Sequence, residues 1–376
     1  MKRLKTVCVY VCISLLVGAL APFAFAQLAS GDNPEAVADA AVEAWLERAE
    51  SFDYFALAQQ SPEAMCQELT VLGQDPRIIQ EATVNLDDRR ELSTDSETDS
   101  EDVRRYSYSA RLSDSLLGSV QVRVVREGDT WQAQGVRLRI NDAGVGLPDF
   151  MRSSTATTVF VLLSVYLVYL LARPSWFRRW LAEGYAVLKD HRRITLGTII
   201  ALYGVYTLGS LAGTAVPECQ EALATIVGGS LEDTGVVDIV SNGNIPQTAA
   251  VITYWNFIQG AILTTFSPAF LFGIPAYLIN LARFFVLGFA LAPVGPQAAL
   301  LVFHVPVIVI ELLAYILVTA GGGIFLATLI RQGFSGFRQG VRRLALTVPI
   351  ALVLLTVGAW YESAEILWLI PLFMGN

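Results

Sequence analysis

The sequence predicts an all-α polytopic transmembrane bundle of about six helices that carries an N-terminal α+β extracytoplasmic domain. Two observations support this fold class. Hydrophobic residues make up 54% of the chain and charged residues only 16%, a balance typical of helices whose solvent is lipid. Long apolar stretches also follow one another from Thr155 to Phe373, and the acidic residues concentrate between Gln27 and Met151. Two regions with different solvents follow.

The first 26 residues read as a signal peptide. Met1–Lys5 is basic, Val7–Leu20 is apolar, and Ala24–Ala26 is a small-x-small cleavage site. Residues 27–150 are therefore expected outside the cytoplasm, and residues 151–376 form the transmembrane domain.

The charges of the loops agree with that orientation, because Lys and Arg accumulate on the cytoplasmic side. Basic residues gather between 173 and 193 and between 331 and 343, whereas the loop 217–247 and the C-terminal tail with Glu362 and Glu365 carry only acids. We expect a multi-pass protein of the bacterial cytoplasmic membrane with both ends outside. The predicted spans are 155–172, 194–215, 248–267, 269–292, 298–330 and 344–361.

Two of these spans leave alternatives open. Ser267-Pro268 and Pro275 leave almost no loop between spans three and four, so a re-entrant hairpin would preserve the same charge pattern. The run 298–330 is long enough to be tilted, kinked at Pro306 or broken at Gly321–Gly323.

The exported segment is predicted to begin with helices and to end in a β-meander. Pro34–Ala49 has apolar residues at helical spacing, and a second helical stretch follows around 62–69. Residues 106–112, 118–125 and 130–140 alternate with period two, with a tight turn at 126–130. This order resembles the NTF2-like cone fold, which implies a pocket for a ligand or partner. The acidic stretch 93–102 is expected to be a solvated loop, with a calcium site as the alternative.

Cys66 and Cys219 are the cysteines that remain after the signal peptide is removed. The predicted topology places both outside, where disulfides form. They are a candidate disulfide, and the alternative is two separate thiols.

The main functional signal is a set of polar residues inside the predicted spans. A charged side chain at bilayer depth costs about 2.5–3.5 kcal/mol, so it is retained mainly when it is paired or lines a polar cavity. At about 1.5 Å per helical residue, these side chains fall about 9–20 Å below the outer boundary. We expect an Arg283–Glu311 ion pair with the other members around it. The predicted mid-membrane polar cluster is Asn256, Asn280, Arg283, His304 and Glu311.

Three interpretations of this cluster remain open. It is structural glue between helices, a pathway for protons or a solute, or a catalytic centre. An intramembrane protease needs a serine–histidine pair, two aspartates or a metal, and zinc needs about three protein ligands. Spans three to five offer one histidine and one carboxylate, so we predict no enzyme, no metal and no cofactor.

Residues 249–331 resemble the membrane core of the stage II sporulation protein M family. The resemblance rests on Trp255–Phe257, Ile279–Leu281, Phe303–Val305 with Glu311, and Ala320–Gly323. In that family the histidine and glutamate usually lie one helical turn apart, whereas His304 and Glu311 lie two turns apart. The resemblance implies a non-enzymatic membrane scaffold.

We therefore expect a scaffold or assembly factor of the cell envelope, with a transporter or channel as the alternative. The expected partners are the lipid bilayer and an envelope or membrane protein, with no nucleic acid. Residues 176–191 read as an amphipathic helix that lies along the membrane or docks a partner.

Overall fold

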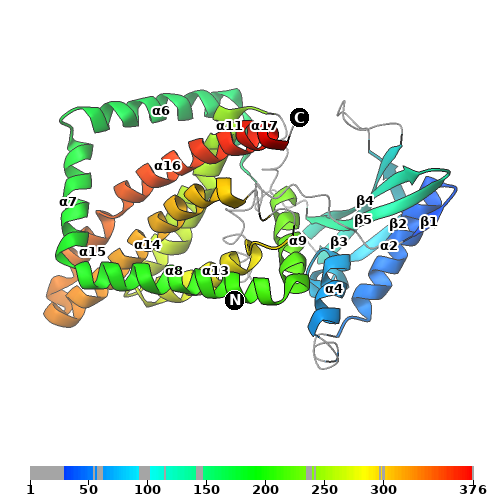
Figure 1. Cartoon of the computed structure of the whole chain (residues 1–376), viewed down its shortest axis with the longest axis horizontal. Helices are drawn as coiled ribbons and strands as arrows, with labels where there is room; N and C mark the ends of the chain where they lie inside the picture. Colours follow the sequence, from blue (N-terminus) through cyan, green and yellow to red (C-terminus); the bar gives the residue numbers. More distant parts are fainter. Residues whose placement is uncertain are drawn as a thin grey trace. The chain divides into compact units, whose positions relative to one another are not determined.

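The chain forms two compact units in the computed structural model (Figure 1). Among the described residues, the first unit contains those from 29 to 146 together with 216–234, and the second contains 147–215 together with those from 235 onward. The predicted signal peptide and most of the acidic stretch 93–102 lie outside the described residues. The structure describes residues 29–374 except 54–55, 57–61, 93–101, 114–115, 141–146, 234–238, 241–242, 296–297 and 299–300.

The first unit is built on a five-stranded antiparallel sheet with the order β1-β5-β4-β3-β2. The three strands predicted from alternation fall within β3, β4 and β5. The predicted turn also joins β4 to β5, where Gly128 adopts a φ of 66° that suits glycine. The strands are β1 (Ser30–Gly31), β2 (Thr83–Glu91), β3 (Val103–Ser113), β4 (Leu116–Glu127) and β5 (Thr130–Ile140).

Helix α2 (Pro34–Glu50) supplies the other half of this unit's core. The side chain of Asn33 caps it by accepting a 3.0 Å hydrogen bond from the Glu35 amide, and Pro34 occupies the first helical position. Trp45 is fully buried, and its indole donates a 3.0 Å hydrogen bond to the carbonyl of Leu72 at the end of α4 (Pro62–Leu72). A short helix, α5 (Pro76–Gln80), leads into β2. An α+β domain is thus present, as the sequence predicted.

Helix α9 (Pro217–Asp233) belongs to this same unit, although two long helices precede it in the chain. It packs on α4, and a disulfide joins Cys66 of α4 to Cys219 of α9, with their Cα atoms 4.7 Å apart. The sequence predicts an acidic loop over residues 217–247. In the structure the first half of this segment is a helix of the first unit.

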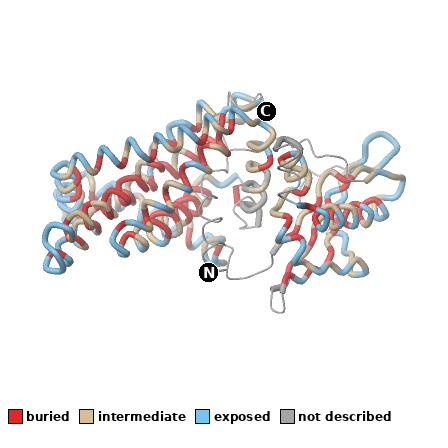
Figure 2. The backbone as a smooth tube through the Cα atoms, turned by 90° about the horizontal axis from the view of Figure 1, so that it is seen from below, coloured by how far each residue is buried: buried red, intermediate tan, exposed pale blue. Residues whose placement is uncertain are grey.

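The second unit is a helical bundle. Within the described part of the chain, three helical stretches are long and apolar enough to cross a membrane: Ser154–Ala172, Arg192–Ala215 and the continuous stretch Leu301–Phe373, with Ile274–Ala290 a shorter apolar helix. Buried residues follow the inner sides of the helices (Figure 2). The helices are η2 (Asp149–Arg152), α6 (Ser154–Ala172), α7 (Trp176–Asp190), α8 (Arg192–Ala215), α11 (Ile245–Thr253), η3 (Tyr254–Phe266), α12 (Ser267–Ala269), α13 (Ile274–Ala290), α14 (Leu301–Gln332), η5 (Gly333–Gly336), α15 (Phe337–Ala345), α16 (Val348–Ala364), η6 (Glu365–Leu369) and α17 (Ile370–Met374).

Large apolar side chains cover the outer faces of α6 and α8. Leu162, Val168 and Ile200 are 63%, 65% and 71% exposed. Exposed apolar surface on this scale is costly in water and favourable in lipid. The second unit therefore has the surface of a membrane protein.

The turn between α12 and α13 is held against α14. Helix continues through Ser267–Ala269, so the turn lies four residues later than the predicted boundary, and Phe272 and Gly273 adopt positive φ angles. A Cβ atom at Gly273 would lie 2.5 Å from the carbonyl oxygen of Gly322. Only glycine permits this approach together with a φ of 77°.

Helix α14 runs unbroken through Pro306 and the three glycines 321–323. These glycines lie where other helices begin: Gly321 faces Thr347 before α16, and Gly323 faces Ile194 near the start of α8. Because Gly322 contacts the α12–α13 turn, these helix ends meet at one level of the bundle, about 15 Å before the end of α14.

Candidate functional site

All five residues of the predicted mid-membrane polar cluster are buried in the bundle. Asn256, Asn280 and Glu311 are fully buried, and Arg283 and His304 are 2% and 4% exposed. Their neighbours extend the cluster into a longer chain of polar side chains, which we call the buried polar chain. It consists of Asn256, Thr264, Thr265, Asn280, Arg283, His304, Glu311, Tyr315, Thr319, Glu362 and Glu365.

Helix α14 carries four members of the buried polar chain. His304, Glu311, Tyr315 and Thr319 follow one another at intervals of seven, four and four residues, which places them on one helix face. His304 and Thr319 are separated by about 22 Å along the helix axis. A bilayer's hydrocarbon core is about 30 Å thick, so the buried polar chain covers most of that depth.

At the centre of the buried polar chain, Asn256 links η3 to α14. Its Nδ2 donates to Glu311 Oε1 at 2.5 Å, and its Oδ1 accepts from the Tyr315 hydroxyl at 3.1 Å. A Cβ atom at Gly260 would lie 2.6 Å from that hydroxyl, so glycine leaves the room that the Tyr315 ring occupies. The amide thus joins the carboxyl group of Glu311 to the phenol of Tyr315.

Arg283 and Asn280 lie at one end of the chain. The guanidinium of Arg283 donates to the hydroxyl of Thr264 and stacks over the Tyr315 ring, 4.7 Å from its centroid. Asn280 donates to Thr319 Oγ1 at 3.1 Å and to the carbonyl of Ala276, the residue one turn earlier, at 2.8 Å. These contacts tie α13 to η3 and α14.

The other end of the buried polar chain is formed by Glu362 and Glu365. The charge pattern of the sequence predicts these two residues in an external tail. Glu362 and Glu365 are fully buried, because α16 continues into η6 and α17 and keeps them inside the bundle. Glu362 lies beside Glu311, since a Cβ atom at Gly358, one helical turn before Glu362, would be 3.2 Å from Glu311 Cγ. His304 Nδ1 lies 3.2 Å from Glu365 Oε1. The interpretation of these glutamates as tail residues was wrong.

The burial of Glu311 and Glu362 side by side has a chemical consequence. Two neighbouring carboxylates in a buried site repel each other when both are ionised, and a proton on one of them relieves the repulsion. The pair is therefore arranged to hold a proton, and His304 with Glu365 lies next along the chain. Carboxyl groups and an imidazole in sequence are the groups that membrane proton relays use.

The two π-helical segments among the bundle's described residues each carry members of the buried polar chain. Segment η3 carries Asn256, Thr264 and Thr265, and segment η6 begins with Glu365. π-Helical turns are rare and occur frequently at functional sites, because the wider turn re-aims side chains. Their coincidence with the buried polar chain marks this region as the candidate site.

The structure leaves part of the sequence prediction open. The contacts described for Glu311 are with Asn256 and Glu362, and those described for Arg283 are with Thr264 and Tyr315. The direct Arg283–Glu311 ion pair stays a prediction. Within the described ranges, no group of three or more His, Cys, Asp and Glu residues is arranged to hold a metal ion.

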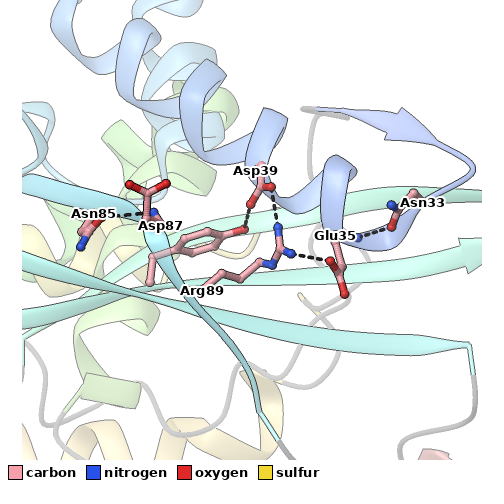
Figure 3. A network of polar contacts seen from close by, with 7 residues as sticks. Asn33, Glu35, Asp39, Asn85, Asp87 and Arg89 are labelled. Atoms are coloured by element: carbon pink, nitrogen blue, oxygen red, sulfur yellow. Dashed lines mark hydrogen bonds and ion pairs between the residues drawn. The ribbon is translucent and has the colours of Figure 1, made fainter.

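A second polar network lies in the first unit, between α2 and the sheet (Figure 3). Arg89 of β2 pairs with Glu35 and Asp39 of α2, and the hydroxyl of Tyr108 donates to Asp39 at 2.7 Å. Burial raises the pKa of Tyr108, and the hydrogen bond to Asp39 raises it further. Because Arg89 joins one helix to one strand with both carboxylates satisfied, this network fits a structural role.

No family model, curated protein or solved structure matches the chain. The resemblances to the stage II sporulation protein M family and to the NTF2-like fold therefore rest on the sequence patterns and stay predictions.

Proposed function

We propose that this protein is a polytopic transport protein of the bacterial cytoplasmic membrane that moves protons along the buried polar chain. The observation that carries the proposal is the burial of Glu311 and Glu362 side by side, continued by His304 and Glu365 at one end and by Asn256 and Tyr315 at the other. This observation favours transport over a scaffold, because the sequence alone indicates one carboxyl group at this depth, Glu311, and Glu362 and Glu365 are two more.

A purely structural role explains this composition less well. Helices in membranes are commonly held together by neutral amides and hydroxyl groups, at about 0.6 kcal/mol for an average hydrogen bond. Three carboxyl groups in one buried cluster bring a desolvation cost that well-packed apolar side chains would avoid. Retaining Glu311, Glu362 and Glu365 together is therefore better explained by proton transfer.

The proposed topology has six crossings with the soluble unit outside. Residues on both sides of α6–α8 belong to that one unit, and a compact water-soluble unit cannot straddle a bilayer. The chain must therefore cross an even number of times between them, which α6 and α8 achieve. The turn between α12 and α13 lies level with the start of α8, which favours full crossings over a re-entrant hairpin.

A scaffold that recruits an envelope partner is the second candidate. It is favoured by the construction of the soluble unit, in which two distant chain segments are closed into one module by the Cys66–Cys219 disulfide. Such a module is suited to hold a partner at a fixed place on the membrane surface.

The experiment that separates the two uses the full chain reconstituted in vesicles with an internal pH-sensitive dye. After an external pH step, wild type is expected to speed the internal response over empty vesicles, because protons pass along the chain. Glu311→Gln and Glu362→Gln are each expected to abolish this gain, since an amide cannot release a proton. Glu183→Gln, the same change at an exposed glutamate of α7, is the matched control and should behave as wild type.

The proposal fails if wild-type vesicles respond no faster than empty ones while the protein is folded and inserted. Crosslinking through the soluble unit in cells would then test the scaffold. A defined envelope protein captured by wild type and by Glu311→Gln alike would support it.

A further inference from the structure

One end of the bundle is strongly basic, although the whole chain carries a formal net charge of -8. This end consists of α7, the junctions beside it, the end of α14, and α15. It contains two acidic residues, Glu183 and Asp190. Its basic residues are Arg173, Arg178, Arg179, Lys189, Arg192, Arg193, Arg331, Arg338, Arg342 and Arg343.

Helix α7 lies across this end of the bundle, between the end of α6 and the start of α8 (Figure 1). Phe177 and Leu188 are buried against the bundle, whereas Trp176 and Trp180 are 47% and 49% exposed. The two indole rings meet edge to face at 4.9 Å. A transverse helix with exposed tryptophans has the form of an element that lies in the membrane interface.

An open surface pocket of about 520 Å³, which we call the cavity, lies where α6 ends and α7 begins. Arg178 and Arg179 line it, and both are exposed. Glu183, one of the two acids at this end, is engaged by Arg342 at 3.0 Å. The cavity therefore presents positive charge. Its lining consists of Pro174, Ser175, Trp176, Arg178, Arg179 and Ala182.

We propose that this cavity binds the phosphate of an anionic phospholipid headgroup. Arginine is suited to this ligand, because its planar guanidinium donates two parallel hydrogen bonds to phosphate oxygens. The exposed apolar face of α6, with Leu163 and Val168, ends beside the cavity and offers a surface for the acyl chains. The inference requires only that α6 and α8 cross a bilayer, and it stands whether or not protons move along the buried polar chain.

The test measures lipid binding to the purified full chain in a non-ionic detergent, by native mass spectrometry. Wild type is expected to bind phosphatidylglycerol more tightly than phosphatidylcholine with the same acyl chains. An arginine near an anionic surface contributes about fivefold in affinity, so Arg178→Gln with Arg179→Gln should weaken phosphatidylglycerol binding about twenty-five-fold. Arg331→Gln with Arg338→Gln removes the same charge from the same end outside the cavity, and it should leave binding close to wild type.

Three results would overturn the proposal. Equal losses in the two double variants would mean that diffuse charge attracts the lipid and that the cavity binds nothing specific. Equal affinity for the two lipids would remove the role of the headgroup. Complete displacement of phosphatidylglycerol by inorganic phosphate would show that the site reads a free anion instead of a lipid.

A conservative variant guards against loss of structure as the cause. Arg178→Lys with Arg179→Lys keeps the charge and loses the planar fork. It is expected to bind phosphatidylglycerol with an affinity between wild type and the glutamine variant. Binding as weak as in the glutamine variant would contradict the assignment.

Discussion

The crossing of α8 and α13 gives the sharpest structural prediction, because glycines bring the two backbones into contact there. A Cβ atom at Gly213 would lie 2.5 Å from the carbonyl oxygen of Phe289 and 2.8 Å from the Cβ of Ala292, whereas ordinary contacts begin at 3.4 Å. The change Gly213→Ala therefore forces the helices apart by close to 1 Å. Small residues at such crossings are what allow membrane helices to pack closely.

The magnitude follows from two opposing effects. Overpacking a tight interface costs about 1–3 kcal/mol, and alanine gains about 0.8–1 kcal/mol of helix propensity over glycine. The same helix provides matched controls, since a Cβ atom at Gly197 or Gly204 would meet nothing within 4 Å. The net destabilisation expected for Gly213→Ala is about 0–2 kcal/mol, whereas Gly197→Ala and Gly204→Ala keep the propensity gain of up to about 1 kcal/mol and should be neutral or stabilised.

The assay is unfolding of the full chain in mixed micelles with a rising fraction of SDS, followed by tryptophan fluorescence. We expect the variants to differ in the SDS fraction at the unfolding midpoint, with Gly213→Ala unfolding at a lower fraction than either control. If all three alanine variants share one midpoint, the close approach of α8 and α13 is refuted.

Three further predictions concern other parts of the molecule. Cys219→Ser should lower the stability of the soluble unit by about 2–5 kcal/mol, measured by denaturant unfolding without reductant; an unchanged midpoint would mean that the disulfide does not form. Burial and the hydrogen bond to Asp39 raise the pKa of Tyr108 above its ordinary value near 10. The protonated Tyr108 hydroxyl therefore contributes its full share to the stability of the fold below pH 10, and this share is lost as the pH rises further. Tyr108→Phe should cost about 1 kcal/mol at pH 7 and flatten the loss of stability above pH 10, and an alkaline profile identical to wild type would contradict this. Asn256→Leu leaves the buried Glu311 carboxyl without its amide donor and should lower the SDS midpoint by an amount corresponding to about 1–3 kcal/mol; the conservative Asn256→Gln should lose less, and equal loss would argue against the hydrogen bond.

The sequence was most informative where one physical pattern dominated. Pro34–Glu50 has a cap, a proline at its start and an apolar stripe, and it forms α2 as predicted. Ser154–Ala172 is apolar throughout and forms the long exposed helix α6. Strand β2 was missed, because Asp87–Arg90 interrupt the alternation that identifies strands. The structure explains those charges, since β2 is an edge strand with a bulge between Asn85 and Arg89.

The distribution of charge along the sequence predicts the C-terminal carboxyl groups in a solvated tail, whereas they are buried in the bundle. Glu362 and Glu365 follow an apolar run and read as the start of a solvated tail. Their spacing of three residues, and the apolar residues that resume at Ile366, are the signal that the helix continues. Glu362 faces a neighbouring helix because α16 packs against α14. The residue pattern of α16 alone does not predict which helix it packs against.

The first unit is composed of two separated chain segments, and this has a consequence for how the protein is made. Its residues before 147 are synthesised first, and α9 emerges only after α6, α7 and α8 have been produced. Until then Cys66 lacks the thiol of Cys219, and α4 lacks the helix that packs on it. The unit therefore reaches its final structure only after the long helices α6 and α8 have been made, and a fragment that ends at residue 150 would lack one of its helices.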